Sequence, residues 1–277
     1  MTLTVVFSAS ISFLIGSKVQ GDIIWTNWFI LTLGGFLVTA AANGFNEIIE
    51  KDLDKLMKRT MDRPIPAGRM TTGQALVLSL LMGIAGTLIL VRLNFLTGVL
   101  SVFSIFLYAF LYTPLKRKSP IAVFVGAFPG ALPPLIGYFA SFASFDVPVF
   151  RETAFILFLI QFVWQFPHFW AIAWVLDDDY KLAGFRLLPT KKRDKTSSFL
   201  IVLSTLILIP VGLMPTIYGF GGYIYAAVSV ICGLIFCWQA IKLYIKGDVL
   251  SAKKLMYSSF LYLPLVQLAL LFDFIIK

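Results

Sequence analysis

Charged side chains are scarce in this sequence. Asp, Glu, Lys and Arg make up 13% of its 277 residues, whereas soluble domains carry roughly 25%. Its polar stretches are also too short to form a soluble domain of their own. These absences exclude an ordinary soluble protein, and the 59% hydrophobic content predicts one transmembrane domain over residues 1–277.

Cysteine and histidine are almost absent. Cys232 and Cys237 lie inside one apolar run, with no CxxC pattern and no partner cluster. They are predicted to pack against lipid or other helices, and they indicate no redox compartment. The first apolar run begins almost at Met1 without a basic segment before it, which disfavours a cleaved secretory signal.

Long apolar runs, by contrast, fill the chain. A run of about 20 residues is long enough to cross a bilayer as a helix. We therefore predict an all-α polytopic membrane protein with nine transmembrane helices, or eight if the proline-rich fifth run is too short. The runs lie near residues 3–20, 24–45, 73–92, 94–113, 119–141, 152–175, 197–218, 221–245 and 255–275.

Positive charge exceeds negative charge, with 23 Lys and Arg against 14 Asp and Glu. In a soluble protein this excess would suggest nucleic acid, but here most of the cations lie in the loops after the second, fourth, sixth and eighth runs. The positive-inside rule places these loops and the amino terminus in the cytoplasm and the carboxyl terminus outside. We therefore expect a lipid bilayer, and no nucleic acid, as partner.

The most informative polar segment follows the second run. Asn46, Glu50 and Asp54 recur at every fourth residue, so a continued helix would place them on one face, about 6 Å apart along its axis. Oxygen ligands so spaced suit Mg²⁺, which fills its other positions with water and phosphate oxygens. Arg59 and Arg63 follow, and they are candidate partners of a diphosphate.

Asp52 is the candidate metal ligand that the geometry favours least. It would lie roughly 200° around the helix from Glu50, at about 100° per residue. The alternative for the whole segment is a polar loop between two spans, charged because it is wet. The regular spacing of Asn46, Glu50 and Asp54 favours the metal site.

A second acidic cluster, Asp177 to Asp179, ends the sixth run. Asp178 and Asp179 are predicted to help hold Mg²⁺ around the same diphosphate, because both clusters are expected on one side of the membrane. A helix cap in a wet loop is the alternative. Lys116 and Arg117 close the fourth run beside Tyr112, either as diphosphate ligands or as a positive-inside anchor with an interfacial tyrosine.

The only histidine, His168, lies within the sixth run between Trp164 and Trp170. A polar residue inside a span is a functional candidate by default. Pro167 can loosen the helix there, and the aromatic surroundings suit a flat apolar ligand or a carbocation. The alternative is a histidine that hydrogen-bonds to a neighbouring helix.

Glycines and prolines concentrate in the fifth run. Gly126 and Gly130 lie four residues apart and permit close helix approach. Packing explains this pattern, and a bent helix could also widen a cavity.

Together these segments resemble the UbiA-type intramembrane prenyltransferase superfamily, from about Asn43 to Pro189. The first motif is Asn46-x3-Glu50-x-Asp52-x-Asp54-x2-Met57-x-Arg59-Thr60-x2-Arg63-Pro64, and the second is Tyr112-Thr-x2-Lys116-Arg117. Residues 126–137, Trp164-Gln165-x-Pro167-His168-Phe169 and Asp179-Tyr180-x2-Ala183-Gly184 look like the stretches that separate members acting on haem from those acting on quinone precursors. Glu50 stands where the family usually has Asp, which keeps the charge on a longer arm.

The resemblance implies nine helices around a central cavity in a bacterial inner membrane. It implies that a farnesyl group passes from farnesyl diphosphate to the vinyl group of haem B, with Mg²⁺ as cofactor. Partners would then include haem A synthase or assembly factors of a terminal oxidase. The acceptor would contact His168, Trp164, Gln165, Tyr112 and Tyr180.

Two alternatives remain open from the sequence. The acceptor could be a quinone precursor or another aromatic compound. From a different class, the chain could be a small transporter with an intramembrane acidic site. A transporter would more often carry ionisable groups at mid-membrane and show repeated halves, whereas here nearly all charge lies at one interface.

Overall fold

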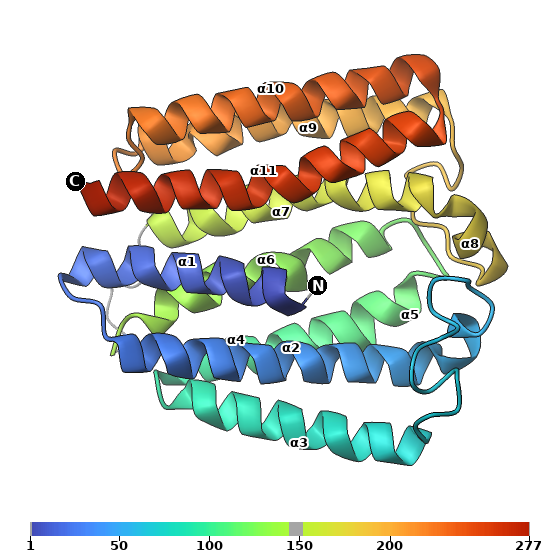
Figure 1. Ribbon diagram of the computed structural model, residues 1–277, viewed down its shortest axis with the longest axis horizontal. Coiled ribbons are helices and arrows are strands. Elements are labelled where there is room, and N and C mark those ends of the chain that lie inside the picture. The colour runs from blue at the N-terminus through green and yellow to red at the C-terminus, as the bar shows by residue number, and fades with distance from the viewer. Residues whose placement is uncertain (1, 144–151, 277) are drawn as a thin grey trace.

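A computed structural model describes residues 2–143 and 152–276 of the chain, and all of its regular elements there are helices (Figure 1). They are α1 (Thr2–Gln20), α2 (Trp25–Asp54), α3 (Thr72–Val91), α4 (Phe95–Ile105), η1 (Phe106–Tyr112), α5 (Thr113–Leu115), α6 (Ala122–Ala140), α7 (Glu152–Val175), α8 (Asp177–Leu182), α9 (Lys195–Ile217), α10 (Tyr223–Lys246) and α11 (Val249–Ile276). Here η1 is a π-helical segment, and α4, η1 and α5 form one continuous rod.

The prediction of nine transmembrane helices is confirmed. Within the described ranges, 9 helical segments are long and apolar enough to cross a membrane. The fifth of them, α6, is helical through all three of its prolines. Two spans are longer than the apolar runs alone indicated, because α2 continues to Asp54 and α11 begins at Val249.

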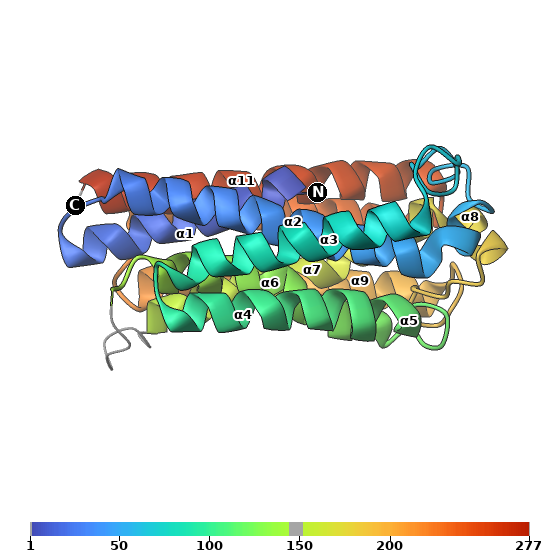
Figure 2. The same cartoon turned by 90° about the horizontal axis from the view of Figure 1, so that it is seen from below.

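The long helices run side by side along the long axis of the molecule (Figures 1 and 2). The α2–α3 loop, α5 and α8 gather at one end, on the right in both views, although they lie far apart in the sequence. We call this the acidic end, because it carries residues 46–54 and 177–179. The outer surface carries many exposed hydrophobic side chains, which suit contact with lipid. The helices also satisfy their own backbone hydrogen bonds, as a lipid environment requires.

Small residues allow neighbouring helices to approach closely. A Cβ at Gly137 in α6 would lie 1.9 Å from the main-chain oxygen of Ala9 in α1. A Cβ at Gly34 in α2 would lie 2.7 Å from Leu90 in α3. Neither position can carry a side chain without moving its neighbour, as is usual for membrane helix pairs that pack through glycine.

The prolines of α6 create hydrogen-bond acceptors inside the bundle. Pro134 has no N–H, so the carbonyl of Gly130, one turn earlier, lacks its helical donor. The side chain of Gln161 in α7 supplies one instead, with Nε2 2.7 Å from that oxygen. A polar side chain is thereby held between two membrane helices.

Candidate active site

The acidic face of α2 is as the spacing predicted. The helix reaches Asp54, so Asn46, Glu50 and Asp54 lie on one side of it. All three side chains are buried, and Asp54 is 0% exposed. Burying two carboxylates is costly unless cations or hydrogen bonds compensate them, and each of the two has such a partner.

Glu50 is compensated by Lys116. The Nζ of Lys116 lies 2.6 Å from Glu50 Oε1, and Asn46 Nδ2 donates to Glu50 Oε2 at 3.0 Å. The ammonium group also lies near the rings of Tyr112 and Phe185, 5.1 and 5.2 Å from their centres. Burial lowers the pKa of Lys116, and the charge of Glu50 opposes this shift.

Asp54 is compensated by Arg63. Its Oδ2 accepts from Arg63 Nη1 at 2.8 Å, and Thr60 donates to its main-chain oxygen at 3.0 Å. The second carboxylate oxygen, Oδ1, is buried without a hydrogen-bond partner in the described part of the chain. The helix ends at Asp54, so Arg63 reaches the acidic face because the loop folds back.

Among the contacts of the described residues, those of Asp179 link the second cluster to the loop that follows the first. The two carboxylate oxygens of Asp179 each accept from a loop N–H at 3.3 Å, those of Lys58 and Arg59. Asp178, by contrast, has a side chain that is 79% exposed and lies 3.1 Å from Arg193. The structure thus brings Asp179 to the loop that follows the first cluster, and leaves Asp178 at the surface.

Sequence reasoning named Asp177 only as a member of the second cluster and did not single out Arg193. Asp177 is buried, with Oδ2 2.7 Å from Lys181 and 3.6 Å from Arg193. Arg193 also donates from Nε to the carbonyl of Trp174 at 2.8 Å. These contacts attach α8 to the end of α7 and to the loop before α9.

The remaining charged candidates lie at the surface. The Asp52 side chain is 74% exposed and pairs with Lys55 at 3.3 Å, in keeping with its predicted place away from the acidic face. Arg59 and Arg117 are exposed. Tyr180 is buried, and burial raises the pKa of its hydroxyl, with Arg59 opposing this shift.

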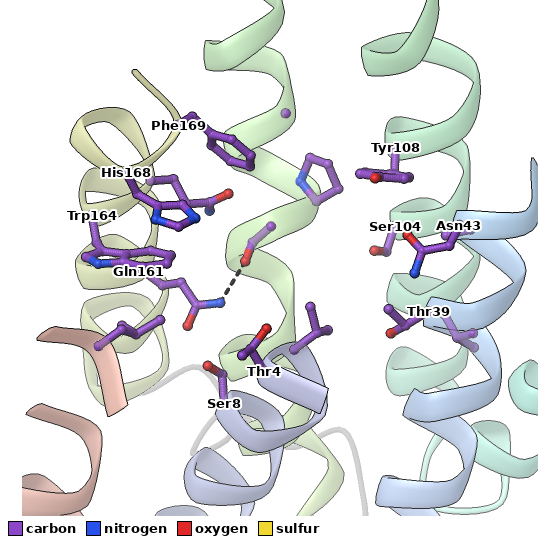
Figure 3. A pocket seen from close by; sticks show the side chains of 18 residues that line it. Thr4, Ser8, Thr39, Asn43, Ser104, Tyr108, Gln161, Trp164, His168 and Phe169 are labelled. Carbon is purple, nitrogen blue, oxygen red and sulfur yellow. Dashed lines mark hydrogen bonds between the residues drawn. The ribbon is translucent and has the colours of Figure 1, made fainter. Parts of the chain in front are cut away.

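A cavity opens beside the acidic face, between α1, α2, the α4–η1 rod, α6, α7 and α11 (Figure 3). It contains about 900 Å³ of empty space, including the part open to its surroundings. In Figure 3, Trp164 and His168 on α7 face Tyr108, Ser104 and Asn43 across it. Asn43 lies one turn before Asn46 on α2, so the cavity adjoins the acidic site.

His168 is held tightly on the cavity wall. Its Nδ1 lies 2.8 Å from Ser259 Oγ of α11. Trp164 stacks on the imidazole with ring centres 4.3 Å apart, and the indole N–H donates to the Ser259 carbonyl at 3.0 Å. The sequence analysis left two alternatives open for His168, a hydrogen bond to a neighbouring helix or a role in a functional site. The structure shows the hydrogen bond to α11, and it also shows that His168 lines the cavity.

Two glycines of α6 make room for other predicted acceptor contacts. A Cβ at Gly126 would lie 2.7 Å from the ring of Tyr112, and one at Gly130 would lie 1.9 Å from Gln165 Oε1. Gln165 donates from Nε2 to the carbonyl of Ala127 at 2.9 Å. The glycine spacing therefore serves the cavity wall as well as helix packing.

The π-helical segment and the first residue of α5 supply two residues to which the sequence analysis gave no role. Thr113 accepts from Asn46 Nδ2 at 2.9 Å and donates to the Tyr108 carbonyl at 2.8 Å. Tyr108 lines the cavity, with its ring 5.5 Å from that of Tyr112. The signal available in the sequence was the recurrence of polar groups inside an apolar run. The π-helical turn found there fits a functional role, because such turns often occur at functional sites.

The donor set of the acidic face fits Mg²⁺. No three His, Cys, Asp or Glu side chains converge on one point within residues 2–143 and 152–276. However, Mg²⁺ needs only one or two carboxylates besides water and phosphate oxygens. Glu50, Asp54 and the Asn46 amide are oxygen donors on one face, and Asp54 Oδ1 is unpartnered. To bind there, the metal ion would have to displace Lys116 from Glu50 and Arg63 from Asp54.

Known proteins resemble this chain over most of its length. The model of the UbiA prenyltransferase family matches residues 5–263. A protoheme IX farnesyltransferase of Cytophaga hutchinsonii is 47% identical over 275 residues, covering 99% of this chain and 94% of that protein. One of Flavobacterium psychrophilum is 43% identical, covering 99% and 91%.

Solved structures share the fold. A digeranylgeranylglyceryl phosphate synthase structure matches with a TM-score of 0.79 and 21% identity, covering 99% of this chain and 94% of that one. A UbiA homologue from Archaeoglobus fulgidus bound to GPP and Mg²⁺ matches with a TM-score of 0.65 and 12% identity, covering 98% and 99%. At these identities the likeness shows the architecture alone.

Proposed function

The chain belongs to the UbiA prenyltransferase family, and on that premise we propose that it transfers a farnesyl group from farnesyl diphosphate to a vinyl group of haem B, giving haem O. The observation that carries the proposal is an acidic face lined with cations that adjoins an aromatic cavity. The names of the relatives support haem as the acceptor.

The acidic face binds the diphosphate. Asn46, Glu50 and Asp54 would hold Mg²⁺, which when bound neutralises charge on the leaving diphosphate. Lys116 and Arg63 already lie at the two carboxylates. On substrate binding, each cation exchanges its carboxylate for a diphosphate oxygen and stabilises the negative charge that develops there. Arg59, Arg117 and Asp178 are further candidates from the sequence, and all three are exposed.

The aromatic wall serves the carbon chemistry. Loss of diphosphate leaves an allylic farnesyl cation, which the faces of Tyr108, Trp164 and Phe169 can stabilise. The vinyl group of haem attacks this cation and forms the new carbon–carbon bond. Water then adds to the resulting cation next to the pyrrole and loses a proton, which gives the hydroxyl. The chain supplies no covalent nucleophile, so its contribution is positioning and electrostatics.

The haem itself would be oriented from α7. His168 offers a neutral imidazole in the cavity wall, and such an imidazole is a common iron ligand. Gln165, Tyr112 and Tyr180 complete the set of proposed acceptor contacts.

We propose that residues 1–277 act as one domain in a bacterial inner membrane, with the acidic end in the cytoplasm. The motivation is the concentration of lysine and arginine in the loops at that end. Cysteines introduced at Lys55 and Lys192, with Cys232 and Cys237 changed to Ser, should resist an impermeant reagent added outside intact cells. Their labelling from outside would reverse the orientation.

The decisive experiment supplies both substrates to the purified protein. With farnesyl diphosphate and Mg²⁺, haem B should become a more hydrophobic haem whose mass shows the added farnesyl group and one hydroxyl. EDTA should stop the conversion. If haem stays unmodified while 4-hydroxybenzoate is prenylated, the acceptor is a quinone precursor. If the protein transports a solute across a membrane and prenylates neither acceptor, it is a transporter and the proposal of an enzyme is wrong.

A further inference from the structure

The hydroxyl of Ser259 determines which nitrogen of His168 carries the proton. Ser259 Oγ donates to the main-chain oxygen of Met256 at 2.6 Å. A hydroxyl has one hydrogen, so toward His168 the same oxygen must accept. The 2.8 Å contact is therefore a bond from Nδ1–H of His168 to Ser259. In a neutral imidazole with Nδ1 protonated, Nε2 carries a lone pair.

The surroundings hold the ring in this arrangement. Trp164 stacks on it with only 17° between the ring planes, and Phe169 and Phe260 meet it edge-on, with centres 5.4 and 5.2 Å away. Two neighbouring N–H donors bond to other groups and not to the ring nitrogens of His168. Gln165 Nε2 donates to Ala127, and the Trp164 indole donates to the carbonyl of Ser259.

We infer that Ser259 is a positioning residue, which makes His168 present an unprotonated Nε2 to the cavity as the ligand of a metalloporphyrin iron. This inference rests on the proposed function for the identity of the acceptor, while the contacts of Ser259 carry the tautomer. A ligand histidine that donates its other N–H to an oxygen is fixed in orientation and becomes a stronger base. Here that oxygen donates its own hydrogen bond to the main-chain carbonyl of Met256, which makes it a better acceptor.

The tautomer can be read directly, because His168 is the only histidine in the chain. Protein labelled with ¹⁵N-histidine gives nitrogen signals from this residue alone. We expect one protonated nitrogen, assigned to Nδ1, and one bare nitrogen, assigned to Nε2. In Ser259→Ala the two forms should exchange and the signals should move together. Ser259→Thr keeps the hydroxyl and should preserve the wild-type pattern.

Ser258→Ala is a matched control on the same helix. Ser258 also donates to a carbonyl of the preceding turn, that of Lys254, but the hydrogen bond of the histidine goes to Ser259. This variant should keep the wild-type nitrogen signals. Thermal unfolding of each variant identifies any general loss of structure. A wild-type spectrum with the proton on Nε2, or an unchanged tautomer in Ser259→Ala, overturns the inference whatever the acceptor is.

A haem titration tests the consequence. The affinity for haem B, followed by the Soret band, should fall about tenfold or more in Ser259→Ala, as for other partners of ligand histidines. Ser259→Thr and Ser258→Ala should bind as the wild type does, and His168→Ala should lose the ligated spectrum. If Ser259→Ala binds and converts haem with an unchanged spectrum, the role of Ser259 fails and the proposed function stands. If the wild type does not bind haem and prenylates another acceptor, both fail together.

Discussion

The two acidic clusters are alike in composition and differ in environment. In the first, Glu50 and Asp54 are buried, and each carboxylate lies against one cation. In the second, Asp178 is exposed, and Asp179 uses its oxygens to hold two loop N–H groups. The first therefore has the features of a site where charge is exchanged with a ligand, whereas the second organises the loop beside it.

The cause of this difference is helical geometry. Residues 46, 50 and 54 are separated by about one turn each, so their side chains share a face. Residues 177–179 are consecutive, and consecutive side chains of a helix point about 100° apart. Consequently one of them is buried against Lys181 and Arg193, one meets the α2–α3 loop and one faces outward. Spacing, more than acidity, decides which carboxylates can converge on one ligand.

The largest expected effect comes from the first cluster. Asp54→Asn removes the charge beside Arg63 and alters the buried oxygen that has no partner. We expect turnover to fall by about two to three orders of magnitude, as when other groups that stabilise transition-state charge are removed. The measurement is farnesyl transfer to haem B at saturating Mg²⁺.

Asp52→Asn is the control for Asp54→Asn, since it changes a carboxylate of the same helix that is exposed. It should retain nearly full activity. Equal losses in the two variants would show that the acidic face has no special role.

Asp179→Asn should have a smaller effect, of about tenfold. The amide can replace only one of the two acceptor oxygens, and a hydrogen bond to a charged group contributes roughly 1.5–3 kcal/mol. Because the loop carries Arg59 and Arg63, the expected change is a higher KM for farnesyl diphosphate. A collapse of kcat at unchanged KM would instead indicate that Asp179 is a metal ligand.

The number and positions of the transmembrane helices and the acidic face of α2 could be predicted from the sequence. Apolar runs of bilayer length and a fourth-residue repeat are local signals, and both follow from helix geometry alone. The contact of Arg63 with Asp54 could not be predicted in the same way. It depends on a loop that leaves the helix at Asp54 and folds back on it, and no periodic pattern describes such a loop.

The cavity was predicted only in part. His168 was recognisable because a polar residue inside a span is unusual. Its partner Ser259 was not, since the two lie 91 residues apart and serine is common in apolar helices. The role of Gln161 depends on a carbonyl that Pro134 leaves without a donor, and on the register between α6 and α7. Contacts of this kind are tertiary, so they cannot be predicted from local patterns in a single sequence.

Lys116→Met should separate the two tasks of the first cluster. In the wild type, Lys116 pairs with Glu50, so under the proposed function it would compete with a metal ion for that carboxylate and would also be available to the diphosphate. The variant should therefore bind Mg²⁺ alone several times more tightly, and farnesyl diphosphate several times more weakly. Because exposed cations have no such competing role, Lys118→Met is the control. Calorimetric titration with each ligand measures both constants, and weaker binding of both would contradict the exchange of partners.

The smallest expected effect is that of Asp178→Asn, and it tests the comparison most directly. Sequence reasoning gave Asp178 the same metal-binding role as Asp179. In the structure its side chain is 79% exposed and pairs with Arg193, at 3.1 Å, on the surface. Such a pair contributes about 0–1 kcal/mol, and Arg193 keeps its bond to the Trp174 carbonyl without it. Turnover, KM for farnesyl diphosphate and the Mg²⁺ requirement should therefore stay within about twofold of wild type, which corresponds to less than about 0.5 kcal/mol. A loss comparable to that of Asp54→Asn would mean that α8 reorients when the substrates bind and brings Asp178 to the diphosphate, and the two clusters would then act as one.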